Sequence, residues 1–332
     1  MVLVTGGCGF IGSAFIIEWL RIVGEPLVNL DLLTYAGRIE NLKDIENDPR
    51  YRFVHGDIGD RALVGRLLAE HRPRAVIHIA AETHVDRSIN GPLQFVETNV
   101  LGTARLLESA HAHWEALPKE QAAAFRFVNV STDEVYGSLA PDAPAFTEQH
   151  RYEPNSPYSA SKAGADHLVR AWHHTYGFPV VTTHCSNNYG PRQFPEKLVP
   201  LMIHHALEGK PLPVYGDGLH VRDWLHVDDH CSALRAVLDR GRPGESYNVG
   251  GRSERRNIDL VRTLCSTLDE MRPRRDGKDY ADLVTYVTDR RGHDRRYAID
   301  DTKIARELDW RPSVKFEEGL RGTIAWYLGR IA

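Results

Sequence analysis

The chain has 332 residues, of which 42% are hydrophobic and 26% are charged, as in an ordinary globular protein. Its formal net charge of -4 argues against a nucleic-acid or anionic-membrane partner, because either would favour a basic surface. No apolar stretch approaches the roughly 18 residues of a membrane span and no signal segment follows Met1, so we expect a cytoplasmic protein. The scattered cysteines (Cys8, Cys185, Cys231 and Cys265) fit a reducing compartment and predict no metal site.

Apolar runs typical of strands recur through residues 1–185, with helical stretches between them. They are VLVTG, PLVNLD, YRFVHGDI, AVIHIAA, RFVNVST and PVVTTHCS. This alternation predicts an α/β fold, namely a Rossmann-type, doubly wound parallel sheet with helices on both faces. Further on, LPVYG, SYNVGG and VTYVTD alternate more loosely. We therefore expect residues 186–332 to form mainly a smaller C-terminal lobe, with a segment near 224–250 returning to the first sheet.

The first run leads into VTGGCGFIG, which places Gly6, Gly9 and Gly12 between a strand and an apolar helix. Glycines let backbone N–H groups approach a pyrophosphate at a helix N-terminus, so this loop predicts a dinucleotide site. Asp31 ends the second strand, where its carboxylate accepts hydrogen bonds from ribose hydroxyls and repels a 2′-phosphate. The pattern favours NAD over NADP, with a plain structural turn as the alternative. Asp57, at the end of the third strand, is placed to bind the adenine amino group.

The fifth run, FVNVSTDEVYG, ends in two adjacent carboxylates, Asp133 and Glu134. Ser131 and Glu134 have the spacing of a helix capping box, which is the structural alternative. However, the carboxyl end of such a strand opens into the ligand crevice of a doubly wound sheet. One acid and one base side by side are what the elimination of water from a sugar requires, whereas epimerisation at C4 requires neither.

Two long helices are predicted, at about 93–114 and 156–176. The second carries Tyr158 and Lys162, four residues apart and hence on one face. An ammonium beside a phenol favours the phenolate and lowers the tyrosine pKa, which suits a base that takes a proton from a sugar hydroxyl. The alternative is an amphipathic surface pair.

Together these motifs resemble the extended short-chain dehydrogenase/reductases, and TDEVYG looks like the signature of their nucleoside-diphosphate-glucose 4,6-dehydratases. The resemblance continues through DLLTYAG, AAETHVDRSI, SPYSASK, SNNYGPRQFPEKL, LPVYGDG, VRDWLHVDDH, YNVGG and GHDRRYAID. It implies NAD as cofactor and dTDP-glucose as substrate, with C4 oxidation, elimination of water across C5 and C6, and return of hydride to C6. The product, dTDP-4-keto-6-deoxyglucose, would feed deoxysugar synthesis such as the rhamnose route. UDP-glucose dehydration, UDP-sugar 4-epimerisation and a catalytically silent NAD-binding regulator stay open as alternatives.

The resemblance also implies a homodimer through the two long helices, and it implies roles for individual residues. Tyr158 is expected to act as base, Lys162 to bind the nicotinamide ribose and Thr132 to position the substrate hydroxyl. Asp133 is expected to be the acid at the C6 hydroxyl and Glu134 the base at C5. Cofactor contacts are expected from Gly6, Gly9, Phe10, Ile11, Gly12, Asp31, Leu32, Thr34, Gly37, Asp57, Ile58, Ala80, Ala81, Thr98, Tyr158 and Lys162. Substrate contacts, mainly in a sugar-nucleotide-binding second lobe, are expected from Thr83, Thr132, Asn187, Glu196, Lys197, Leu198, Pro213, Tyr215, Arg222, Asn257, Asp289 and His293.

Three features of this set bear on the substrate. The guanidinium of Arg222 suits diphosphate oxygens by its own chemistry. Thr83 stands where the family pattern has serine, which keeps a hydroxyl and adds a methyl group to the sugar pocket. Arg291 stands where proline is common before GHDRR, so the shape of that loop is open.

Overall fold

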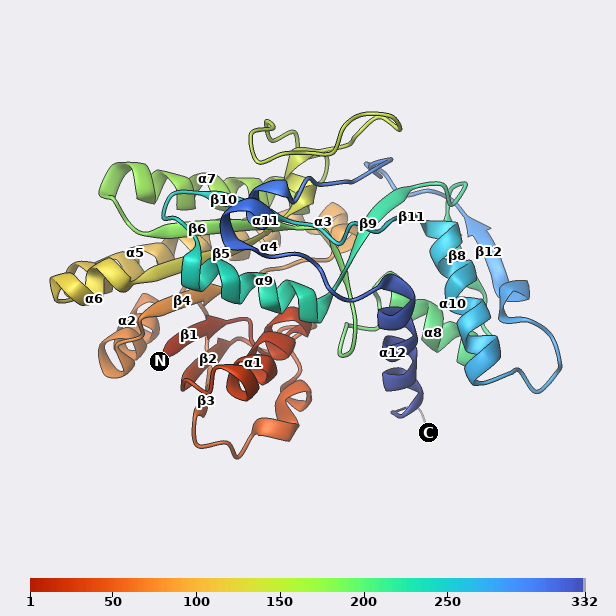
Figure 1. Ribbon diagram of the computed structural model, residues 1–332, viewed down its shortest axis with the longest axis horizontal. Helices are drawn as coiled ribbons and strands as arrows, with labels where there is room; N and C mark the ends of the chain where they lie inside the picture. Colours follow the sequence, from red (N-terminus) through yellow and green to blue (C-terminus); the bar gives the residue numbers. More distant parts are fainter. Residues whose placement is uncertain (331–332) are drawn as a thin grey trace.

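A computed structural model describes residues 1–330, and its larger lobe is built on one seven-stranded sheet (Figure 1). All strand pairs in this sheet are parallel, in the order β10-β6-β5-β4-β1-β2-β3. The strands are β1 (Val2–Thr5), β2 (Leu27–Asp31), β3 (Tyr51–His55), β4 (Ala75–His78), β5 (Arg126–Thr132), β6 (Val180–Cys185) and β10 (Ser246–Val249). Helices lie on both faces, so the predicted Rossmann-type, doubly wound fold is confirmed.

Both faces of the sheet are buried, because side chains alternate along each strand and are apolar on both sides. In β1, Val2 and Val4 join the core on one face, whereas Leu3 joins the core on the other. The Val2 face is covered by α1 (Phe10–Ile22), α9 (Val227–Arg240) and α11 (Thr302–Leu308). The Leu3 face is covered by α2 (Arg61–His71), α5 (Thr103–Glu115) and α7 (Pro157–Tyr176).

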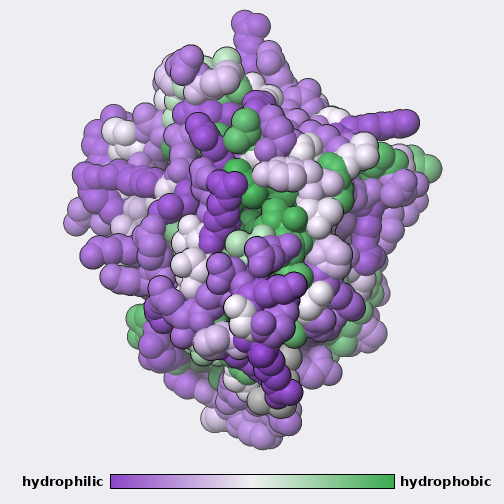
Figure 2. Space-filling view, turned by 90° about the vertical axis from the view of Figure 1, so that its right-hand side faces the viewer, coloured by the Kyte–Doolittle hydropathy of each residue, from purple (hydrophilic) through white to green (hydrophobic). Residues whose placement is uncertain are grey.

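A smaller lobe, on the right in Figure 1, has its own core. It contains a three-stranded sheet of β7 (Asn187–Tyr189), β9 (Val221–His226) and β11 (Glu254–Arg256), and a pair of β8 (Leu212–Tyr215) and β12 (Val284–Val287). Its helices are α8 (Leu198–Leu207), α10 (Asn257–Met271) and α12 (Phe316–Leu328). Figure 2 views this side, where hydrophilic side chains cover most of the surface and hydrophobic ones form a central band.

The chain returns to the large sheet within the segment expected near 224–250. Trp224 and Leu225 belong to β9, because they pair with β7 in the smaller lobe. The return begins with α9 and ends with β10, which pairs with β6 at the sheet edge. A division of the chain at residue 185 stays a prediction.

The first predicted long helix consists of α4 (Pro92–Phe95), a π-helical turn η2 (Val96–Gly102) and α5. The second is α7, whose start is fixed by a capping box in which the Ser156 and Ser159 side chains each accept a hydrogen bond from the other residue's backbone N–H. The remaining elements are η1 (Ile39–Ile45), α3 (Val85–Asn90), α6 (Lys119–Ala124), η3 (Asp133–Tyr136) and η4 (Tyr280–Leu283). Within residues 1–330, no helix combines the length and apolar character needed to cross a membrane.

Candidate active site

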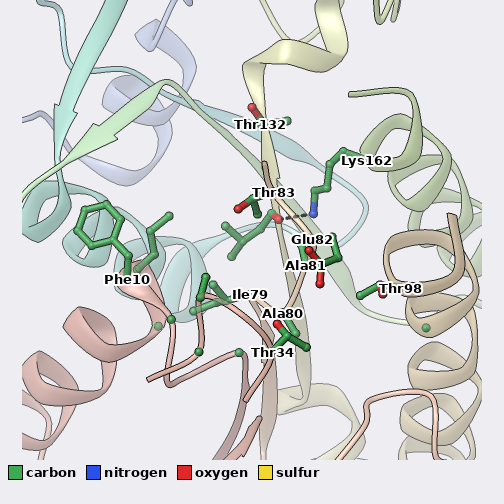
Figure 3. A pocket seen from close by; sticks show the side chains of 18 of the residues that line it. Phe10, Thr34, Ile79, Ala80, Ala81, Glu82, Thr83, Thr98, Thr132 and Lys162 are labelled. Carbon is green, nitrogen blue, oxygen red and sulfur yellow. Dashed lines mark hydrogen bonds between the residues drawn. The ribbon is translucent and has the colours of Figure 1, made fainter. Parts of the chain in front are cut away.

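A cavity of about 580 Å³ opens at the carboxyl ends of the large-sheet strands, between the two lobes (Figure 3). It includes the point between β1 and β4 where the strand order reverses, the usual ligand site of such sheets. All five residues predicted to be catalytic line this cavity, and so does every residue predicted to contact the cofactor.

The glycine loop lies on the floor of the cavity and is held by close backbone contacts. Gly6 has a φ of +73°, and a Cβ on Gly12 would lie 2.2 Å from the Gly6 carbonyl oxygen. The Asp31 carboxylate accepts hydrogen bonds from the backbone N–H groups of Cys8 and Leu33, both at 2.8 Å. Asp31 therefore fixes the shape of the loop, a second role beyond its predicted contact with ribose. Burial raises the Asp31 pKa, and these two hydrogen bonds oppose the rise.

The chain leaves β5 in a short 3₁₀ turn that carries the two carboxyl groups. The Thr132 hydroxyl accepts a hydrogen bond from the Glu134 backbone N–H at 3.3 Å and lies 3.4 Å from Asp133 Oδ1. Ser131 instead donates to the carboxylate of Asp166, at 2.6 Å. The alternative of a Ser131–Glu134 capping box is therefore wrong, because the Ser131 hydroxyl is engaged with α7.

Asp133 and Glu134 differ in their electrostatic surroundings. Burial raises the pKa of Asp133 well above its ordinary range, and the charges of Glu134 and Asp223 raise it further. Asp133 Oδ2 is buried without a hydrogen-bond partner among the described residues. Burial also raises the Glu134 pKa, but Arg290 and Arg222 oppose this rise. The surroundings therefore favour a protonated Asp133 beside a Glu134 that ionises more easily.

Tyr158 and Lys162 project from the first turns of α7 into the same cavity, as predicted. Tyr158 lies edge-on to Phe95. The Lys162 ammonium donates to the Val130 carbonyl oxygen at 2.9 Å (Figure 3). Burial, followed by the charge of Glu134, raises the pKa of Tyr158 well above its ordinary value. Burial outweighs the other influences on this pKa, and the favouring of the phenolate by the Lys162 ammonium stays a prediction.

Five of the predicted substrate residues line the cavity: Thr83, Thr132, Asn187, Glu196 and Lys197. Lys197 Nζ donates to the Thr83 carbonyl oxygen at 2.9 Å, and Glu196 pairs with Arg87 at 3.1 Å. The other predicted substrate residues lie outside this lining: Leu198, Pro213, Tyr215, Arg222, Asn257, Asp289 and His293.

Two residues of that outer group, Asp289 and His293, lie together with His220, and the Asp289 carboxylate contacts both imidazoles. Asp289 lies 2.6 Å from His293 Nδ1 and 3.3 Å from His220 Nε2, and the two rings stack at 3.7 Å. Burial, with the charges of Arg290 and Arg222, lowers the His293 pKa to about 3. These three residues are of the types that can hold a metal ion. The positive charges of Arg290 and Arg222 beside them favour an anion over a cation.

Sequence reasoning missed three residues near the site. Glu82 lines the cavity and is buried, yet its motif AAETHVD was noted only for the neighbouring Thr83. His220 precedes Arg222 by two positions, the spacing of side chains on one face of a strand, and this spacing was a usable signal. Arg290 acts on Glu134 from the segment Asp289 to His293, which was expected to bind the nucleotide, but its proximity to the carboxyl pair was not predicted.

The site can be compared with known proteins. The sequence model of the family described as GDP-mannose 4,6 dehydratase matches residues 3–323. The chain belongs to this family. The dTDP-glucose 4,6-dehydratase of Xanthomonas campestris pv. campestris strain B100 is 60% identical over 326 residues, which are 98% of this chain and 92% of that protein.

Solved structures agree with this relationship. DesIV, a dTDP-glucose 4,6-dehydratase of Streptomyces venezuelae crystallised with NAD and TYD bound, has a TM-score of 0.90 and 48% identity, covering 99% of this chain and 97% of that one. A UDP-glucose 4-epimerase of Thermotoga maritima has a TM-score of 0.85 at 28% identity, covering 100% and 99%. The predicted resemblance to the 4,6-dehydratases is confirmed.

Arg291 departs from the sequence pattern of the 4,6-dehydratases, and the loop around it has a defined shape. Gly292 has a φ of +64°, and a Cβ there would lie 3.0 Å from the Asn155 carbonyl oxygen. The contact between Asp289 and His293 closes the loop across four residues. Thr83, the other departure from the family pattern, faces the cavity (Figure 3).

Proposed function

We propose that this protein removes water from dTDP-glucose to give dTDP-4-keto-6-deoxyglucose, with NAD as a bound cofactor that is not consumed. The observation that carries the proposal is the pair of adjacent carboxyl groups, one favoured as the acid and one as the carboxylate, beside Tyr158 and Lys162. The high identity to proteins named dTDP-glucose 4,6-dehydratase supports the same substrate. Such a reaction supplies deoxysugar synthesis, for example the rhamnose route.

The residues of the cavity fit NAD. The glycine loop has no room for a Cβ at Gly12, which lets backbone N–H groups approach the expected pyrophosphate, and Asp31 lies at the strand end expected to face a ribose. When bound, NAD supplies a hydride acceptor for C4 and a donor that returns the hydride to C6. We expect NAD to be the nucleotide released when the purified protein is denatured, and finding mainly NADP would contradict the role of Asp31.

The protein side chains move the protons. Tyr158 takes the proton of the C4 hydroxyl, with Thr132 positioning that hydroxyl and Lys162 favouring the phenolate by its charge. The resulting 4-ketone acidifies C5, from which Glu134 removes a proton. Asp133 donates a proton to the C6 hydroxyl, which leaves as water, and the proton held by Glu134 returns to C5 when hydride is added at C6. These assignments follow the environments of the two carboxyl groups, because the pKa is raised more strongly for Asp133, the less exposed of the two, which favours its protonated form.

The smaller lobe is suited to the nucleotide. Arg222 is buried and its guanidinium lies over the Tyr297 ring at 4.3 Å, which fixes a positive charge close to Glu134. The positive charges of Arg222 and Arg290 together favour binding of the negatively charged diphosphate. We assign the nucleotide and its diphosphate to the outer group of predicted residues: Leu198, Pro213, Tyr215, Arg222, Asn257, Asp289 and His293.

A turnover experiment with dTDP-glucose and UDP-glucose side by side tests the function. Dehydration should give a keto product that is lighter by one water, and deuterium placed at C4 should reappear at C6. A product of unchanged mass would identify an epimerase, which Asp133 and Glu134 disfavour. Faster turnover of UDP-glucose would move the assignment to the uridine nucleotide.

We further propose that the protein is a homodimer and works in a reducing cytoplasm. Large apolar side chains are exposed on the two long helices and outside the cavity lining: Leu93, Val96 and Tyr176. A second copy pairing these helices into a four-helix bundle covers this surface. The four free cysteines are all buried thiols, as suits a protein that keeps them reduced.

A further inference from the structure

A buried carboxylate, Asp166, lies directly beneath the proposed active site. It follows Lys162 by one turn of α7, and its exposed fraction is only 4%. Its two oxygens accept hydrogen bonds from Asn129 Nδ2 at 2.8 Å and from Ser131 Oγ at 2.6 Å. Both donors belong to β5, the strand that ends in Thr132. Asp166 therefore joins the helix that carries the Tyr158–Lys162 pair to the strand that carries the carboxyl groups.

The far side of Asp166 is also enclosed by polar groups. His184 Nε2 lies 3.4 Å from an Asp166 oxygen. The same imidazole is hydrogen-bonded to the hydroxyls of Tyr152, at 2.7 Å, and Tyr136, at 3.1 Å. None of the proposed catalytic steps uses these groups. Burying a carboxylate in a protein core costs free energy even when hydrogen bonds surround it, so its presence calls for a role.

The negative charge of the Asp166 carboxylate can favour the charged form of Lys162. Lys162 is buried, and its ammonium has one hydrogen-bond acceptor, Val130 O, among the described residues. An ammonium in such a place tends to lose its proton unless a negative charge lies nearby, and burial does lower the Lys162 pKa. The charge of Asp166 is the strongest influence that opposes this.

Two further titratable groups that interact with Lys162 bring no comparable negative charge. Cys185, from β6, is a thiol whose pKa burial raises to about 12. His78, from β4, has its pKa lowered by burial to about 3, and it is hydrogen-bonded on both sides, to Thr5 and Thr103. Both groups are neutral near pH 7, so the counter-charge comes from Asp166.

We propose that Asp166 is the positioning residue and counter-ion of Lys162, keeping its ammonium charged and holding α7 in register with β5. This role rests on the proposed function, in which the Lys162 charge favours the phenolate of Tyr158.

The substitution Asp166→Asn tests the charge separately from the hydrogen bonds. An asparagine can still accept from Asn129, and its amide can donate to the Ser131 hydroxyl, which is free to rotate. We measure the pH dependence of the first oxidation in an Asp133→Asn background, so that Asp133 does not titrate. Loss of the carboxylate should move the alkaline limb to lower pH by about one to three units. The rate below that limb should change much less.

Ser131→Ala is the matched control. It removes one hydrogen bond and keeps the charge, so it should lower the rate at every pH without moving the limb. An unmoved limb in Asp166→Asn, or an equal shift in both variants, would overturn the proposal.

A measurement on the wild-type protein covers the case in which Asp166→Asn does not fold. With ¹³C-labelled lysine, the Lys162 Cε resonance, assigned by its loss in Lys162→Arg, should show a charged ammonium at pH 7. A neutral amine at that pH would refute the counter-ion role. This test needs no turnover, so it also separates a failure of the inference from a failure of the proposed function, which absence of dehydration by the wild-type enzyme would reveal.

Discussion

At the scale of single residues, the division of labour between Asp133 and Glu134 has a kinetic consequence. Asp133→Asn and Glu134→Gln should each still oxidise C4, because Tyr158 performs that step, while loss of water slows by about 10²–10⁴. Reduced cofactor should therefore accumulate on mixing with dTDP-glucose, as seen by stopped-flow absorbance. Tyr158→Phe should block even this accumulation. Two carboxyl variants that turn over at the wild-type rate would show that the pair has no chemical role.

The same Asp133 predicts a dependence of stability on pH. Its pKa is raised above the unfolded value of about 3.9, so the folded protein binds the extra proton. Stability from this group is present at low pH and is lost as the pH rises towards the folded-state pKa. In the Asp133→Asn variant this pH-dependent loss of stability is absent. The unfolding temperature of the variant should therefore exceed that of the wild type by a margin that grows from pH 5 to pH 8.

Scanning calorimetry at both pH values measures this margin. Glu134→Gln is the control and should gain less, because the pKa of Glu134 is raised less strongly. An Asp133→Asn variant that is less stable than the wild type at pH 8 would contradict the assigned burial penalty.

The local sequence was enough to predict that two carboxyl groups end a buried strand and face a ligand. It was not enough to predict which one holds its proton. That difference comes from Asp223 on β9 and Arg290 in the loop after β12, which reach the site only through tertiary packing. For the same reason, the raised pKa of Tyr158 was missed, since burial cannot be read from spacing along a helix.

At the scale of elements, Gly12 of the glycine loop and Gly65 of helix α2 differ in the space available for a Cβ. An alanine at Gly12 would press its Cβ against the backbone of Gly6, which cannot move without changing the cofactor loop. A strain of about 1–3 kcal/mol corresponds to roughly five- to 150-fold weaker NAD binding. Gly65, on α2, has open space, and Gly65→Ala should leave NAD binding unchanged while stabilising the fold by about 0.5–1 kcal/mol.

Cofactor content after purification and calorimetry distinguish the two variants. Normal NAD content in Gly12→Ala would mean that the loop is not where the pyrophosphate binds.

Element types were predicted well where the hydrophobic pattern was strong, as in the large-sheet strands and α7. The π-helical turn at Val96–Gly102 was not predictable, because its sequence also suits a regular helix. The start of the returning segment can be predicted only to within a few residues, because β9 passes directly into α9 and only the pairing with β7 assigns Trp224 and Leu225 to the smaller sheet.

At the scale of the whole molecule, the proposed dimer gives the clearest expectation. Leu93 is 73% exposed at the start of the paired helices, where a second copy buries it. Leu93→Asp should weaken or abolish the dimer, because a carboxylate would be buried in the bundle without a partner. Ile22, exposed at the end of α1, offers the control Ile22→Asp, which should leave the mass unchanged.

Light scattering at micromolar concentration measures the assembly. A monomeric wild-type protein would contradict the dimer, and a dimeric Leu93→Asp variant would place the interface elsewhere.

The α/β class and the presence of a second lobe followed from the alternation of elements. The gathering of His220 with Asp289 and His293 did not, since about seventy residues separate the first from the others and no periodic pattern connects them. Contacts between lobes depend on how two separately packed cores meet, which local patterns do not encode.

The strand order has a consequence for how the protein is made on the ribosome. Taken in order of synthesis, β2 and β3 extend the sheet from β1 on one side, and β4, β5, β6 and β10 extend it on the other. No strand has to enter between two that are already paired, so a nascent chain can enlarge the sheet only at its edges. Every residue assigned to the cofactor precedes residue 163, well before the smaller lobe emerges. The nucleotide cradle can therefore form, and be stabilised by its ligand, while the sugar-binding half is still being translated.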